Sequence, residues 1–116
     1  MEEPPTTMQR ACFELGIKCG ALYHQFAGTP VSPRSAASLE RAIAESIENQ
    51  PYCVSAEVEI DRDRLSESLD PTHGYTEFTG TIFECEVTVD VEGSRATAEL
   101  VRIEGYPELR ITDLSS

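Results

Sequence analysis

The sequence of 116 residues contains no tryptophan, one lysine (Lys18) and only two histidines (His24 and His73). No apolar run approaches the roughly 20 residues that a membrane span needs. The N-terminus, MEEPPTTMQR, lacks the basic region and apolar core of a signal peptide. We therefore expect a cytoplasmic protein without a membrane partner.

Basic residues are scarce overall. Nine Lys and Arg stand against 21 Asp and Glu, which gives a formal net charge of −12. A field of this sign repels nucleic acid, so nucleic acid is not an expected partner either.

Paired cysteine motifs are also absent. The four cysteines form no C-x-x-C pair and no Cys/His cluster, so we expect no structural metal site. Without secretory signals, reduced thiols are the expected state of Cys12, Cys19, Cys53 and Cys85.

The hydrophobic pattern predicts two helices followed by strands. Apolar residues at helical spacing predict a first helix from a cap at Thr6 or Thr7 to about Phe26. Ser32 and Pro33 predict the start of a second helix, which Pro51 must end near residue 49. Alternation with a period of two then predicts strands, separated by turns, at 54–60, 83–91, 95–103 and 109–111.

The expected fold is a single α+β domain over residues 1–116, with two N-terminal helices packed on one face of a mainly antiparallel sheet of about four strands. Residues 1–5 are expected to form a flexible arm. Residues 62–81 are expected to be an irregular loop, with a short helical turn around 63–69. A slip in the alternation between Leu100 and Val101 predicts a bulge, and Gly105-Tyr106-Pro107 predicts a corner.

The predicted first helix consists mostly of small and apolar residues, but it also contains several polar ones. Glu14 and Lys18 are four residues apart, which favours an ion pair, although a lone lysine could also form a Schiff base. His24 could act as a general acid/base or be a hydrogen-bonded structural residue. Gln50 lies where helix gives way to strand, which is compatible with a pocket or with a simple helix stop. His73 is assigned no role.

The segment FELGIKCGALYHQFAGTPVS, followed by ENQPY, resembles the archaeal-type dihydroneopterin aldolases of tetrahydromethanopterin biosynthesis. The blocks F-E-x-G-I-K, H-Q-F-x-G-T-P-V-S and Q-P-Y occur in this order over the first 52 residues. The resemblance implies retro-aldol cleavage of dihydroneopterin to hydroxymethyl-dihydropterin and glycolaldehyde, without metal or other cofactor. It also implies a homotetramer.

On this resemblance, Glu14 grips the amidine edge of the pterin and Gln50 bonds polar ring atoms. Lys18 holds Glu14 or neutralises developing charge. His24 is the candidate general acid/base, and Tyr106 is a candidate for proton transfer or ring contact.

Helix geometry limits how these residues can combine. Ten residues separate Glu14 from His24, which is about 15 Å along an ideal helix and roughly 80° around it. Both can serve one reaction only if the ligand spans them, the helix bends, or a second subunit contributes. We favour a site at a subunit interface; the rival interpretation is a non-catalytic ligand-binding or scaffold module.

Overall fold

The computed structural model describes residues 2–116, and its first helix, α1, spans Thr7–Gln25. Its start follows the predicted cap. The Thr6 hydroxyl accepts the Gln9 N–H while the Gln9 side chain accepts the Thr6 N–H, a reciprocal capping box. The helix is continuous from Thr7 to Gln25, so Glu14 and His24 lie on one unbroken helix.

The second helix, α2, spans Ala36–Glu48 and begins later than predicted. Pro33 and Arg34 lie in a turn instead, in which the Ser32 carbonyl accepts the N–H groups of Ser35 and Ala36. Ser35, not Ser32, is the N-cap, and its side chain makes no capping bond. The predicted end near residue 49 is confirmed, because α2 ends at Glu48 and Asn49 is its C-cap.

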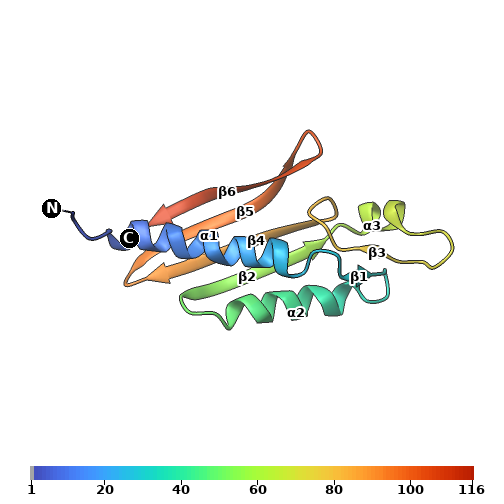
Figure 1. Cartoon of the computed structure of the whole chain (residues 1–116), viewed down its shortest axis with the longest axis horizontal. Coiled ribbons are helices and arrows are strands. Elements are labelled where there is room, and N and C mark those ends of the chain that lie inside the picture. Colours follow the sequence, from blue (N-terminus) through green and yellow to red (C-terminus); the bar gives the residue numbers. More distant parts are fainter. Residues whose placement is uncertain (1) are drawn as a thin grey trace.

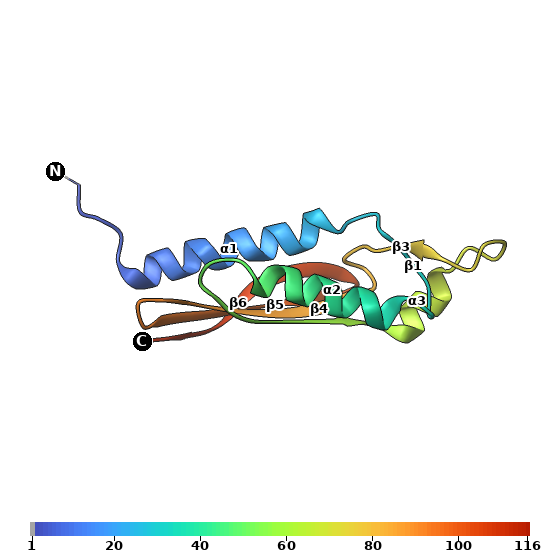
Figure 2. The ribbon, with the colours of Figure 1, turned by 90° about the horizontal axis from the view of Figure 1, so that it is seen from below.

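The main sheet is antiparallel, with the strand order β2 (Cys53–Ile60), β4 (Phe83–Val91), β5 (Ser94–Ile103), β6 (Tyr106–Ser115). Helix α1 packs on β4 and β5, and α2 packs on β2. Figures 1 and 2 show both helices on the same face of the sheet. The predicted α+β architecture is confirmed.

The core lies between this helical layer and the sheet. Leu15 and Leu22 of α1 and Ile43 and Ile47 of α2 are at most 2% exposed, and every second residue of β4 from Phe83 to Val91 is buried. Each fully buried aliphatic side chain stabilises the fold by about 1.5–3 kcal/mol. The alternating apolar residues that predicted β4 therefore form one face of the strand, and α1 covers this face.

Three details of the sheet differ from expectation. The β5–β6 pairing continues in register through Leu100 and Val101, so no bulge lies between them. Irregularities lie instead in β6, where Thr112 is the extra residue between the partners of Thr97 and Ala98, and in β2, where the register shifts between Cys53 and Ser55. The turn before β6 consists of Glu104 and Gly105, both with positive φ, and the last strand is ten residues long.

The segment 62–81 is more regular than expected. It contains helix α3 (Arg62–Ser68), capped by Asp61, and strand β3 (Thr76–Glu77), which pairs with β1 (Pro30–Val31). This short ladder ties the segment to the connection between α1 and α2.

Several apolar side chains remain uncovered on the helical side of the molecule. On β6, Leu109, Ile111 and Leu114 are 39–51% exposed, and on α1, Phe13 is 69% and Ile17 46% exposed. A compact monomer normally covers such groups, so this surface suits contact with another macromolecule.

Candidate active site

Glu14 and Lys18 form the ion pair that their spacing predicts. Lys18 Nζ lies 2.8 Å from Glu14 Oε1, and the lysine side chain is only 3% exposed, against 25% for the glutamate. Burying an unpaired ammonium is costly, so the carboxylate compensates the lysine charge. In turn, Lys18 fixes the position of a carboxylate that still reaches solvent.

The turn between α2 and β2 lies against this pair. Lys18 Nζ lies over the ring of Tyr52, 5.9 Å from its centroid. Gln50 is two residues before Tyr52 and half-buried, so the structure places it in the turn that contacts Lys18. Three of the five predicted site residues thus belong to one region. Tyr52 was not among them, because its sequence context showed only a junction between helix and strand.

His24 lies in the last turn of α1 and is exposed. Its ring makes an edge contact with Tyr23, with centroids 5.2 Å apart. Because the helix is continuous, His24 remains about 15 Å from Glu14 along the axis. It shares a stripe of α1 with Gly20, Ile17 and Phe13, which precede it by four, seven and eleven residues.

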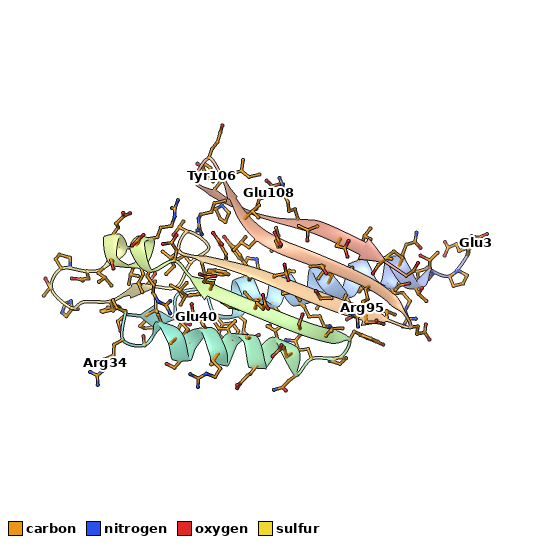
Figure 3. All side chains as sticks on the ribbon, turned by 180° about the vertical axis from the view of Figure 1, so that it is seen from behind. Glu3, Arg34, Glu40, Arg95, Tyr106 and Glu108 are labelled. Carbon is orange, nitrogen blue, oxygen red and sulfur yellow. The ribbon has the colours of Figure 1, made fainter. Side chains whose placement is uncertain are left out.

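Tyr106 is separate from the other candidates. It is the first residue of β6, next to the β5–β6 turn, and is 78% exposed. Figure 3 shows its side chain pointing outward from the tip of this hairpin. The described chain therefore does not bring Tyr106 to Glu14 or His24.

The cysteines are free thiols, and two of them, Cys19 and Cys85, are buried in the core. Burial raises the pKa of Cys19 to about 11 and that of Cys85 to about 12. Both therefore remain protonated at neutral pH and are poor nucleophiles. Their role is packing.

Within residues 2–116, no group of three or more His, Cys, Asp or Glu side chains is arranged to hold a metal ion. No helix in this part of the chain has the length and apolar character needed to cross a membrane.

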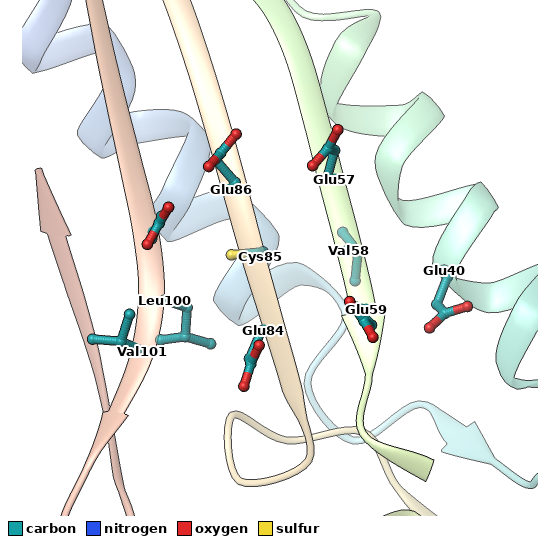
Figure 4. A pocket seen from close by; sticks show the side chains of 10 residues that line it. Glu40, Glu57, Val58, Glu59, Glu84, Cys85, Glu86, Leu100 and Val101 are labelled. Carbon is teal, nitrogen blue, oxygen red and sulfur yellow. The ribbon is translucent and has the colours of Figure 1, made fainter. Parts of the chain in front are cut away.

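A groove of about 390 Å³ crosses the other face of the sheet, and Figure 4 shows the glutamates that line it. Its lining contains no aromatic ring, no histidine and no cation that could stack on or protonate a substrate. We do not regard it as the active site. Its main property is a row of directly opposed carboxylates, Glu57, Glu86 and Glu99, on neighbouring strands.

This row should reduce stability at neutral pH. A hydrogen bond with Glu99, together with partial burial and the charges of Glu99 and Glu57, raises the pKa of Glu86. A carboxyl whose pKa is raised by folding stabilises the fold below its unfolded pKa, about 4.3. That contribution is lost as the pH rises through the higher folded value. We expect Glu86→Gln to raise the melting temperature at pH 7, and the gain to shrink toward pH 4 and in 1 M salt.

The control is Glu67→Gln, at an exposed position of α3 outside the row. It should leave the melting temperature nearly unchanged. A Glu86→Gln protein no more stable than the wild type at pH 7 would show that the row is not repulsive.

With this geometry established, the chain can be compared with known proteins. Residues 6–112 match the family model described as "Dihydroneopterin aldolase". The chain belongs to the dihydroneopterin aldolase family. The family predicted from the sequence is confirmed, and the protein is an enzyme of this family.

Relatives of the chain carry the same name. It is 37% identical over 108 residues to a dihydroneopterin aldolase of Methanopyrus kandleri, covering 91% of this chain and 88% of the relative. It is 33% identical over 104 residues to a dihydroneopterin aldolase of Picrophilus torridus, covering 88% and 84%. The fold is similar to the crystal structure of a Picrophilus torridus protein, with a TM-score of 0.83, 29% identity and coverage of 95% of this chain and 90% of that one.

Proposed function

We propose that the protein cleaves dihydroneopterin to hydroxymethyl-dihydropterin and glycolaldehyde by metal-independent acid–base catalysis. The observation that carries the proposal is the Glu14 carboxylate, held at 2.8 Å by a buried lysine yet open to solvent beside the Gln50 turn, in a chain of this family. Such a group is suited to bind a planar ligand that presents adjacent N–H donors.

Glu14 and Gln50 bind the substrate in this proposal. The two oxygens of an ionised carboxylate accept parallel N–H bonds from the amidine edge of a pterin. Lys18 holds that carboxylate in place, and the Gln50 amide bonds the remaining polar ring atoms. The orientation of the ring then fixes where its side chain lies.

The chemical step needs one group that removes a proton and returns another. A base takes the proton of the hydroxyl on the second side-chain carbon as the bond between the first and second side-chain carbons breaks, and the second and third carbons leave as glycolaldehyde. The electron pair enters the pterin imine, and protonation of the remaining carbon gives the hydroxymethyl product. An imidazole can both accept and donate a proton, so His24 is the candidate group for this exchange, directly or through water. Tyr106 assists proton transfer or contacts the ring.

Lys18 is a poor candidate for the alternative Schiff-base route. An amine that attacks a carbonyl needs its lone pair free, whereas the Lys18 Nζ is engaged in an ion pair with the Glu14 carboxylate 2.8 Å away. Borohydride should therefore trap no adduct on an active enzyme. A covalent adduct at Lys18 would contradict the acid–base mechanism.

We further propose that the site is completed at an interface between copies of this chain. The exposed stripe of α1 that ends at His24 includes Phe13 and Ile17, and the hairpin that carries Tyr106 projects outward. A partner that covers the stripe would bury apolar surface and could supply Tyr106 beside His24. A homotetramer remains the prediction from the sequence, as do the cytoplasmic location and the role in tetrahydromethanopterin biosynthesis.

The direct test is an assay of EDTA-treated protein with dihydroneopterin. We expect glycolaldehyde and hydroxymethyl-dihydropterin in equal amounts, at a rate unaffected by chelation. Loss of activity on chelation that returns with added metal would contradict the metal-independent mechanism. Pterin binding without either product would contradict the proposed reaction.

A further inference from the structure

The turn between α2 and β2 carries an aromatic residue in a backbone conformation that favours glycine. The Gln50 carbonyl accepts the Cys53 N–H at 3.3 Å, with Pro51 second and Tyr52 third in the turn. Tyr52 has φ +71°. Proline second and positive φ third are the features of a type II turn, whose third position is normally glycine or asparagine. A bulky side chain there is disfavoured, so its presence needs a reason.

The other non-glycine residues with positive φ have an ordinary explanation. Glu92 and Glu104 each precede a glycine in a two-residue hairpin turn, where positive φ at both positions is required. Tyr52 lies in no hairpin and precedes Cys53. Its conformation is held by neighbours, because its carbonyl accepts the Asp90 N–H at 2.9 Å and its ring packs beside Lys18.

The ring of Tyr52 lies beside the proposed pterin-binding group. Lys18 Nζ lies over the ring, 5.9 Å from its centroid, and the same ammonium bonds Glu14 at 2.8 Å. Tyr52 is 44% exposed, although Lys18 beneath it is almost fully buried. The ring thus shields the ammonium from water and leaves apolar, planar surface open near the Glu14 carboxylate.

We propose that Tyr52 is a further substrate-binding residue, whose ring stacks on the planar pterin bound by Glu14. This inference rests on the proposed function. A carboxylate fixes the edge of a flat heteroaromatic ligand but not its tilt, whereas an aromatic side chain fixes the plane. This role explains why tyrosine occupies a position that favours glycine: the turn places the ring beside Glu14 and Lys18, and its contacts hold it there despite the strain.

The test measures pterin affinity separately from turnover. The probe is 6-hydroxymethylpterin, an oxidised and non-cleavable pterin whose fluorescence reports binding. Tyr52→Leu retains a bulky residue but removes the ring, and should raise the Kd about five- to tenfold. Tyr52→Phe retains the ring and should bind within about twofold of the wild type. Tyr52→Gly should raise the melting temperature by relieving the turn, yet weaken pterin binding as much as leucine does.

Glu92→Gly is the matched control, because it relieves a positive φ in a remote hairpin and should leave the Kd unchanged. Wild-type affinity in Tyr52→Leu or Tyr52→Gly would overturn the inference while leaving the aldolase proposal intact. If both variants bind pterin weakly while the wild type binds it but releases no product, the role of Tyr52 is supported and the proposed reaction is contradicted. A wild-type protein that binds no pterin would overturn both.

Discussion

The His24→Asn variant is expected to lose about 10²- to 10⁴-fold in kcat with dihydroneopterin, the usual range for a general acid/base. Its affinity for 6-hydroxymethylpterin should stay near the wild-type value, because Glu14 and Gln50 lie in another part of the site. Its oligomeric state should also persist. Asparagine is close to histidine in size and can form hydrogen bonds, but it cannot exchange a proton near neutral pH.

The matched control is His73→Asn. His73 is exposed in the loop after α3, where Nδ1 lies 3.3 Å from Asp70 Oδ2. Turnover of this variant should equal that of the wild type. An unchanged kcat in His24→Asn would exclude His24 as the acid/base, and dissociation of the oligomer would assign it to assembly instead.

The Glu14→Gln variant should lose both pterin affinity and stability. Neutralising the carboxylate removes charge-assisted hydrogen bonds, so the Kd for 6-hydroxymethylpterin should rise about 10- to 100-fold. It also leaves the ammonium of Lys18, 3% exposed, without its counter-charge, at a cost of about 1–3 kcal/mol in unfolding free energy. Calorimetry and fluorescence titration measure the two effects separately.

A double variant distinguishes binding from folding. Glu14→Gln combined with Lys18→Met removes the buried charge and should recover most of the lost stability, but not the pterin affinity. Glu92→Gln is the control. Arg10 of α1 forms an exposed ion pair with Glu92, which lies in the β4–β5 turn, and removing this pair should change stability by less than about 1 kcal/mol. Recovery of pterin affinity in the double variant would contradict substrate binding by Glu14.

Much of this fold follows from local rules. The capping box places the start of α1, the spacing of Glu14 and Lys18 produces their ion pair, and alternation identifies β4 and β5. The capping box and the ion pair depend on residues near one another in the sequence. The strands were predictable because one face of each is apolar and packs against the core.

The features that sequence analysis missed depend on distant partners. The β1–β3 ladder is only two residues long on each strand, too short to show a period. The carboxylate of Glu40, on α2, accepts the Ile60 N–H at 2.6 Å and also bonds the Arg62 guanidinium. No pattern around residue 40 signals a partner twenty residues away.

The candidate site divides in the same way. Glu14 and Lys18 were predictable as neighbours, and the distance to His24 followed from the helical rise. The contact between Lys18 and Tyr52 depends on how α1 packs beside the α2–β2 turn, and nothing in the sequence around Tyr52 indicates a positive φ. The remote position of Tyr106 follows from an extended last strand that alternation predicted only in part.

The most direct test of an acid–base site shared between subunits is complementation between two inactive variants. We expect the purified His24→Asn and Tyr106→Ala variants to have little activity when each is assayed by itself. Co-assembled in equal amounts, they should recover about a quarter of the wild-type activity, because random pairing gives a site both intact residues about one time in four. A mixture no more active than the sum of its components, in a confirmed mixed oligomer, would contradict a site that combines His24 of one copy with Tyr106 of another.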